Sequence, residues 1–289
     1  MIDDQYINGT YFKRYSDPAN KHLLFILTGQ SMSPRAFWDF KLPNGKTHSE
    51  YFFEAGIDVI LFDPIGYGKS TEYYPYDRIS YAKQIKDVTD TITKNYETKT
   101  ILGYSTSTAP ALCNTMYGYF DKIIIKSPGM VYDFDEPTKH DDDFVTNIKN
   151  LKKSRLEEIS DRIIPKTNKL DIWEESLVEI LKTNTTYDNG NWKVPGQVVF
   201  DRRNYWVQHK QHGFDPSKVP PMRIIYGEYD FETIGGQDFI SALSYITPLF
   251  PNAELKVVPN STHFSMWENE CATTREYIIE YCKNETKNY

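Results

Sequence analysis

A serine with small residues two positions to either side lies at the centre of Gly103–Ser107, which reads GYSTS. A strand-like apolar run, Thr98–Leu102, precedes it, and a helix-like run, Thr108–Phe120, follows it. On such a turn, small flanking residues avoid the neighbouring backbone, and strained backbone angles lift the Ser105 hydroxyl clear of the sheet. The start of the helix directs backbone N–H groups at a developing anion. The spacing therefore predicts a nucleophile elbow, the tight turn that presents a catalytic serine.

The overlapping frame STSTA satisfies the same pattern and would make Ser107 the nucleophile. The choice depends on the rest of the chain, because a nucleophilic serine needs a base and the base needs an acid to orient it. Asp230 follows the strand-like run Met222–Tyr226, and His263 follows the run Leu255–Val258. A serine, an acid and a histidine thus stand in that order, each at the end of a different predicted strand.

Two further carboxylates are alternatives for the orienting acid. Glu228 and Glu232 lie close to Asp230 in the sequence, but the spacing after the strand favours Asp230. The order serine, acid, histidine also favours Ser105 over Ser107, because small residues then flank the nucleophile on the strand side and on the helix side. The sequence predicts a triad with a histidine base.

The tetrahedral oxyanion of acyl transfer needs hydrogen-bond donors, and the loss of one donor costs about 3 kcal/mol. One predicted donor is the backbone N–H of Thr106, at the head of the elbow helix. The other is the backbone N–H of Gln30, in the loop after the run His22–Leu27. Gly29 lets the backbone approach the substrate there.

Short apolar runs rich in β-branched residues, Leu and Phe alternate with helical patterns along the chain. The strand-like runs are His22–Leu27, Asp58–Phe62, Thr98–Leu102, Lys122–Ile125, Met222–Tyr226 and Leu255–Val258. The helix-like segments are Glu50–Ala55, Ile79–Tyr96, Thr108–Phe120, Gln237–Phe250 and Ala272–Lys283. Strands buried on both faces that alternate with helices predict a doubly wound, mostly parallel α/β sheet. The opening stretch, Tyr6–Tyr15, alternates like one or two antiparallel edge strands.

The alternation of strand-like and helix-like runs is interrupted between residues 131 and 215. An acidic segment opens this stretch, and mostly helical patterns follow until strands resume at Met222. An insertion of this kind between two strands predicts a helical cap over the carboxyl ends of the strands, where open α/β sheets bind ligands. We therefore expect a core formed by residues 1–130 and 216–289, with residues 131–215 as the cap.

These features resemble the α/β-hydrolase superfamily, and the resemblance covers nearly the whole chain. Besides the serine, acid and histidine, residues 62–70 (FDPIGYGKS) resemble the family's loop after the fourth strand. Residues 221–227 (PMRIIYG) resemble the lead-in to its acid. Where many members have His-Gly, this chain has Thr28-Gly29, which leaves a backbone oxyanion donor in place. A serine nucleophile distinguishes the chain from haloalkane dehalogenases and epoxide hydrolases, in which the nucleophile is an aspartate.

Composition narrows the classes of partner and the compartment. The net charge of -7 provides no general attraction to nucleic acid or to an anionic membrane. No apolar stretch approaches the roughly 20 residues that span a bilayer, and the polar N-terminus does not resemble a secretory signal. Three unclustered cysteines favour reduced thiols, so we expect a cytoplasmic protein.

Two motifs that could bind ligands fail on spacing. The stretch GYGKS at residues 66–70 lacks the glycine that a phosphate-binding loop needs, because position 63 is Asp. His209 and His212 have helical spacing but no matching Cys or further His, so a solvated surface is favoured over a metal site. The sequence implies no cofactor and no metal.

The sequence therefore predicts a serine hydrolase that cleaves a carboxylic ester, or a related acyl bond, of a small apolar molecule. Ser105 would form the acyl-enzyme, with His263 as base, Asp230 as orienting acid, and Gln30 and Thr106 as oxyanion donors. Two alternatives remain open at this stage: a ligand-binding receptor on the same fold, and an acyltransferase that uses the same triad. Sequence does not determine the physiological substrate or the oligomeric state.

Overall fold

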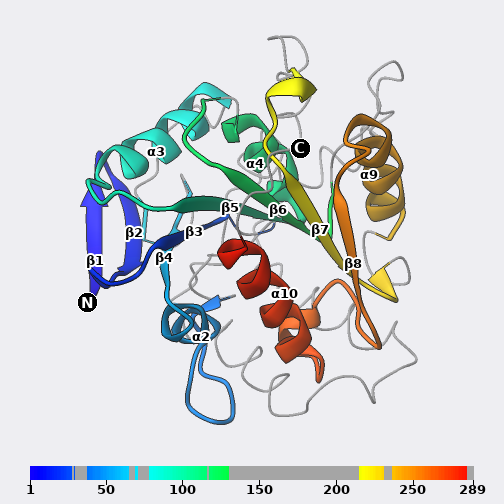
Figure 1. Cartoon of the computed structure of the whole chain (residues 1–289), viewed down its shortest axis with the longest axis horizontal. Coiled ribbons are helices and arrows are strands. Elements are labelled where there is room, and N and C mark those ends of the chain that lie inside the picture. The colour runs from blue at the N-terminus through cyan, green and yellow to red at the C-terminus, as the bar shows by residue number, and fades with distance from the viewer. Residues whose placement is uncertain are drawn as a thin grey trace, which may run out of the picture.

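A single sheet of eight strands runs through the molecule in the order β1-β2-β4-β3-β5-β6-β7-β8 (Figure 1). The structure is a computed structural model, and it describes residues 1–27, 29, 38–64, 69–70, 78–115, 117–129, 215–230 and 236–284. The strands are β1 (Ile2–Ile7), β2 (Thr10–Tyr15), β3 (His22–Leu27), β4 (Ile57–Phe62), β5 (Thr98–Tyr104), β6 (Lys122–Lys126), β7 (Met222–Gly227) and β8 (Glu254–Val258).

Helices and 3-10 turns follow most of the strands. The described helices are α2 (His48–Glu54), α3 (Arg78–Asp90), α4 (Thr108–Thr115), α9 (Gly236–Leu249) and α10 (Cys271–Lys283). The described 3-10 turns are η1 (Ser105–Ser107), η3 (Pro216–Lys218) and η5 (Ser265–Trp267).

Strands β3 to β8 pair in parallel, while β1 pairs with β2 and β2 with β4 in antiparallel fashion. The prediction of a doubly wound, mostly parallel α/β sheet is confirmed. All six predicted core strands are present, and their ends lie within two residues of the predicted ones.

The core lies on both faces of this sheet, because successive side chains of a strand point to opposite faces. On β3, Leu24 and Ile26 belong to the apolar cluster beneath α2 and α10. Leu23, Phe25 and Leu27 belong to the cluster beneath α3, α4 and α9. Figure 1 shows these two groups of helices on opposite sides of the sheet.

The sequence predictions were wrong in detail at the sheet edge and at two helix ends. β8 is an edge strand, so Leu255 and Val257 are exposed rather than buried on both faces. Helix α3 ends at Asp90 instead of Tyr96, because the chain tightens into turns there. Helix α4 ends at Thr115, shortly before Gly118 takes up a left-handed φ of 71°.

The predicted N-terminal strands form a hairpin of which only β1 lies at the edge of the sheet. Asn8 and Gly9 connect them with φ values of 48° and 80°. Positive φ at both central residues is characteristic of the tight type I′ turn, which Asn-Gly favours. The Asn-Gly pair therefore fixes the register in which Ile7 faces Thr10.

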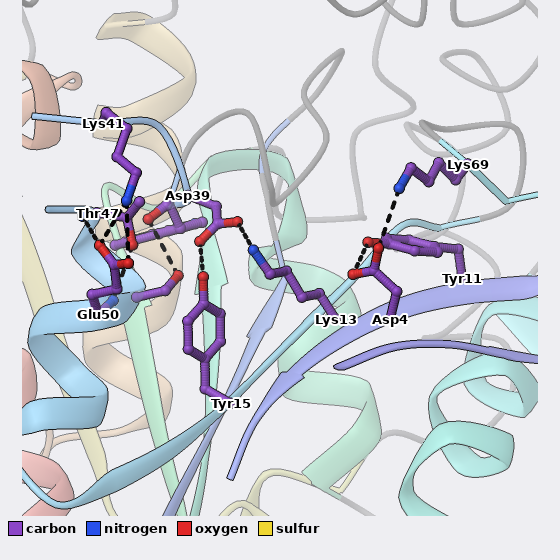
Figure 2. Close-up of polar contacts among 11 residues, drawn as sticks. Asp4, Tyr11, Lys13, Tyr15, Asp39, Lys41, Thr47, Glu50 and Lys69 are labelled. Atoms are coloured by element: carbon purple, nitrogen blue, oxygen red, sulfur yellow. Dashed lines mark hydrogen bonds and ion pairs between the residues drawn. The ribbon is translucent and has the colours of Figure 1, made fainter. Parts of the chain in front are cut away.

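Side chains of β2 fix the segments that follow β3 and β4 (Figure 2). Lys13 and Tyr15 both donate to the carboxylate of Asp39. On the same strand, the ring of Tyr11 lies 4.6 Å beneath the Lys69 ammonium. These contacts attach the segment after β3 and the segment after β4 to the N-terminal hairpin.

The predicted cap, residues 131–215, lies outside the described residues except for Asp215. Strands β6 and β7 pair directly, with Ile125 opposite Ile224, although residues 127–221 separate them along the chain.

A buried aspartate holds the amino ends of the parallel strands together. Asp58 in β4 has no exposed surface. Its carboxylate accepts hydrogen bonds from the backbone N–H of Asp17 at 3.0 Å and from the Asn20 amide at 2.8 Å. It also accepts from the Tyr96 hydroxyl at 2.7 Å and the Lys94 ammonium at 3.1 Å. Removal of this side chain takes an acceptor from all four donors, of which the Lys94 ammonium keeps a second one, the Asp17 carbonyl.

We expect Asp58→Ala to lower the free energy of unfolding by about 3 kcal/mol, because it takes the carboxylate from a paired ammonium and leaves the Tyr96 hydroxyl without this acceptor. Urea denaturation measures this loss. Asp90→Ala is the matched control, since Asp90 pairs with Lys86 at the surface. It should cost no more than about 0.5 kcal/mol. Equal losses in the two variants would contradict this role for Asp58.

Candidate active site

Ser105 has a left-handed backbone at the point where β5 ends. Its φ is 53°, a conformation that costs a non-glycine residue on the order of 1 kcal/mol and that is common at functional sites. The Thr108 hydroxyl donates to the Ser105 carbonyl at 2.6 Å and closes the turn η1. Helix α4 then begins at Thr108. This is the predicted strand-to-helix turn, with the serine at its tip.

Close packing around Ser105 requires a glycine at position 103. A Cβ placed on Gly103 would lie 2.6 Å from both the Ser107 carbonyl oxygen and the Ala111 Cβ. On Gly129, after β6, a Cβ would lie 3.5 Å from Ser105 Oγ. The residues that follow β5 and β6 therefore approach the serine closely, and the expected collision at the flanking position is found at Gly103.

Burial separates the two candidate nucleophiles. Ser107 has no exposed surface, whereas Ser105 is partly exposed. A substrate can therefore reach Ser105 but not Ser107, which argues against Ser107 as the nucleophile.

His263 and Asp230 are brought together as the sequence predicts. His263 Nδ1 lies 2.8 Å from Asp230 Oδ1. The carboxylate is fully buried and also accepts from the Gly227 N–H at 3.3 Å. Burial alone would raise the pKa of Asp230, but His263, the Lys126 charge and the Ser127 hydroxyl together outweigh it and hold this pKa below its ordinary value. An ionised Asp230 keeps the proton on Nδ1, which leaves Nε2 as the basic nitrogen.

The alternative acids do not take this position. The Glu228 carboxylate accepts from the backbone N–H of Asn260 at 2.9 Å, at an exposed position. Glu232 lies outside the described residues.

The imidazole lies beside the elbow. The His263 ring packs on Tyr104, the residue before Ser105, with the ring centroids 5.1 Å apart. The Tyr104 hydroxyl donates to the His263 carbonyl at 3.1 Å. Within the described residues no hydrogen bond joins Ser105 Oγ to the His263 ring, and without substrate such catalytic contacts are often long.

The loops that carry the acid and the base are hydrogen-bonded into one unit. The Glu228 N–H donates to the Val258 carbonyl at 2.9 Å, and the Tyr229 N–H donates to the Ser261 carbonyl at 2.8 Å. A Cβ on Gly227 would lie only 2.4 Å from the Thr262 carbonyl oxygen. Only glycine permits this approach of two backbones.

Comparison with solved structures identifies the fold of the chain. No protein-family model matches the chain, and no curated protein is similar to it in sequence. Bromoperoxidase from Bacillus anthracis superposes with a TM-score of 0.71 at 18% identity, over 98% of this chain and 100% of its own. An esterase from Exiguobacterium antarcticum gives 0.68 at 17% identity, over 97% and 98%. A 2-hydroxy-6-oxo-6-phenylhexa-2,4-dienoate hydrolase from Rhodococcus gives 0.66 at 16% identity, over 97% and 99%.

The chain has the α/β-hydrolase fold. In this fold the residues after β5, β7 and β8 meet at one edge of the sheet, because the carboxyl ends of parallel strands lie together. Ser105, Asp230 and His263 are those residues here.

The two predicted oxyanion donors differ in what the structure describes. Thr106 is the second residue of η1, and its side chain is buried, with its hydroxyl unpartnered among the described residues. Gln30 lies outside the described residues, so its role stays a prediction. Gly29, next to it, is described: a Cβ there would lie 3.2 Å from Ser105 Cβ. The segment after β3 therefore does reach the serine.

Sequence reasoning missed two buried charges behind the His263–Asp230 pair. Lys126 ends β6, and Glu268 follows η5; neither has exposed surface. The Glu268 carboxylate accepts from the Thr262 N–H at 2.8 Å and from the Thr262 hydroxyl. For Lys126 a signal existed, since it is a charged residue at the carboxyl end of an otherwise apolar strand. No sequence signal indicates that Glu268 is buried.

In the part of the chain that the structure describes, no group of three or more His, Cys, Asp or Glu could hold a metal ion. His209 and His212 fall outside that part. Among the described helices, none has the length and apolar character to cross a membrane.

We expect Gly103→Ala to lower the free energy of unfolding by about 1–3 kcal/mol, because the new methyl group meets a backbone carbonyl and a helix side chain. It should also slow labelling of Ser105 by a fluorophosphonate, because the helix start must shift. Guanidinium denaturation and labelling kinetics check both effects. Gly129→Ala is the stability control, since its methyl group would have only ordinary contacts. A Gly103→Ala variant as stable as this control would contradict the packing argument.

Glu268 generates a prediction about pH and stability. Burial raises the pKa of Glu268 to about 7, against the hydrogen bonds from Thr262 that lower it. An acid whose pKa is raised by folding destabilises the folded state as pH rises from its unfolded pKa, 4.5, through 7. We expect Glu268→Gln to gain stability relative to wild type over this range, by up to about 3 kcal/mol. Unfolding free energies at pH 4.5 and pH 8 measure the gain.

Glu254→Gln is the control of opposite sign. Burial raises the pKa of Glu254, but hydrogen bonds from Arg223 and Lys256 outweigh this effect and hold the pKa below its ordinary value. This variant should lose stability relative to wild type as pH rises. If the two variants respond to pH in the same direction, the assignment of a raised pKa to Glu268 is wrong.

Proposed function

We propose that this protein is a serine hydrolase that cleaves a carboxylic ester, or a related acyl bond, of a small apolar molecule. One observation carries the proposal: Ser105 stands in a left-handed turn beside an imidazole that a buried carboxylate orients. The esterase and the dienoate hydrolase among the similar structures support this class of reaction.

The mechanism follows from the roles of these groups. Ser105 Oγ attacks the acyl carbonyl carbon while His263 Nε2 takes the hydroxyl proton, and Asp230 stabilises the imidazolium. The Thr106 and Gln30 N–H groups bind the oxyanion. His263 then gives its proton to the leaving alkoxide, so that an acyl-enzyme forms and the alcohol departs. A water molecule, deprotonated by His263, attacks the acyl-enzyme and releases the acid.

An ester is the favoured substrate class, because an alkoxide is a better leaving group than the nitrogen anion that an amide would have to release. We assign the choice of substrate to residues 131–215, proposed as a helical cap between the core segments 1–130 and 216–289. The direct pairing of β6 with β7 supports this, since the segment between them leaves β6 at the carboxyl edge of the sheet, where Ser105 lies.

We expect a fluorophosphonate probe to label Ser105 alone, because only the activated and accessible serine reacts. Peptide mapping by mass spectrometry identifies the labelled residue. Ser105→Ala should abolish both labelling and the hydrolysis of p-nitrophenyl esters, and His263→Ala should lower the rate at least about a thousandfold.

Ser107→Ala serves as the matched control and should be labelled and active. Label on Ser107, or none on the wild type, would refute the proposed nucleophile. Wild-type protein that binds esters, with no turnover by any acyl length in a graded panel, would favour the receptor reading instead.

A further inference from the structure

Lys126 is a buried lysine that the proposed reaction does not use. It lies at the carboxyl end of β6, with no exposed surface, opposite Tyr104 of β5 in the sheet register. Its ammonium donates to the His263 carbonyl at 2.9 Å and to the Ser127 hydroxyl at 3.2 Å. It also lies 4.7 Å above the Tyr104 ring. A buried ammonium is costly, so contacts of this kind must compensate its lost hydration.

The contact with Ser127 extends to the catalytic acid. The Ser127 hydroxyl accepts from Lys126 and hydrogen-bonds to the Asp230 carboxylate. Its backbone has a left-handed φ of 47°, and its N–H donates to the Ile225 carbonyl at 2.7 Å, which fixes its position. Lys126 is thus connected to His263 through the backbone carbonyl and to Asp230 through one hydroxyl.

Titratable residues from three segments surround this lysine, and Asp230 and Glu268 act on it as charges. Tyr104 comes from β5, Asp230 from the turn after β7, and His263 and Glu268 from the segment after β8. Burial lowers the pKa of Lys126 to about 8, while the charges of Asp230 and Glu268 oppose that change. At neutral pH the lysine is therefore mostly charged, and this positive charge stabilises the ionised form of Asp230.

We propose that Lys126 is a positioning residue of the hydrolytic site: its ammonium anchors the main chain of His263 and, through the Ser127 hydroxyl, holds the Asp230–His263 pair in place. The inference rests on the proposed function for its meaning in catalysis. Removal of a positive charge close to this pair should favour a protonated imidazole, which cannot act as a base. A purely structural lysine would stabilise the fold without any effect on the protonation of His263.

Lys122 provides a matched control on the same strand. It begins β6, is also buried, and donates to the Tyr281 carbonyl at 2.9 Å, with its ammonium 5.4 Å from the Tyr281 ring. It differs from Lys126 in lying at the amino end of the strand, away from His263 and Asp230. Lys122→Met removes the same buried charge without touching the site.

The first readout is the pH dependence of ester hydrolysis. We expect Lys126→Met to move the acidic limb of the kcat/KM profile to higher pH by about one unit. Its rate should therefore fall about tenfold near pH 6, with kcat affected more than KM. The deficit should narrow above pH 8, where wild-type Lys126 loses its own charge. Lys122→Met should keep the wild-type profile.

The second readout needs no turnover. NMR titration of the histidine ring signals, with the His263 signal identified from its absence in His263→Gln, gives the midpoint of its protonation. We expect this midpoint to rise in Lys126→Met and to be unchanged in Lys122→Met. Lys126→Gln, which keeps a donor but has no charge, tests the same shift if the Met variant fails to fold. A midpoint shared by the wild type and the folded Lys126 variants would overturn the inference.

Fluorophosphonate labelling, the pH profile and the NMR titration together distinguish failure of the hydrolase function from failure of the role of Lys126. Wild-type protein without labelling at Ser105 refutes the hydrolase function, and the NMR midpoint still decides whether Lys126 controls the protonation of His263. Active wild-type protein with an unshifted midpoint and an unshifted pH profile refutes the role of Lys126 alone.

Discussion

Parallel register among β5, β6, β7 and β8 is the constraint on which the site depends. Parallel pairing brings the carboxyl ends of all four strands to one edge, so that residues distant in sequence become neighbours. Tyr104 faces Lys126 across β5 and β6, and Gly227 faces Val258 across β7 and β8. A shift of one residue in either pair would turn the side chains to the opposite face and separate the serine, the acid and the base.

Both ends of the sheet bury charge, and the two ends use it differently. At the amino ends, Asp58 is surrounded by four donors and has a structural role. At the carboxyl ends, Lys126, Asp230 and Glu268 lie close enough to affect one another's protonation. At the amino ends, both oxygens of the Asp58 carboxylate are hydrogen-bonded. At the carboxyl ends, the pKa values of Lys126 and Glu268 lie near neutral pH, at about 8 and about 7. Buried groups of this second kind concentrate at functional sites.

Sequence alone predicted the strands and the three residues that follow them, because strand signals are local and strand ends converge by topology. Ser105, Asp230 and His263 were selected from their order and position alone, and their catalytic roles stay predictions. Lys126 and Glu268 were missed, since their importance comes from burial among residues of four separate segments. The edge position of β8 was missed for a similar reason: the sequence of one strand does not determine which strands pair with it. The contribution of Gln30 stays a prediction.

The adjacency of β6 and β7 has a consequence for how this molecule can change. The segment between them, residues 127–221, leaves the carboxyl end of β6 and returns to the amino end of β7, so it runs from one edge of the sheet to the other. The entropy of closing a loop between two such points grows only with the logarithm of its length, about 0.6 kcal/mol for each doubling. Replacement of that segment by a longer or shorter one therefore perturbs the stability of the sheet little. The sheet that carries Ser105 and the segment between β6 and β7 can therefore vary in sequence independently of each other.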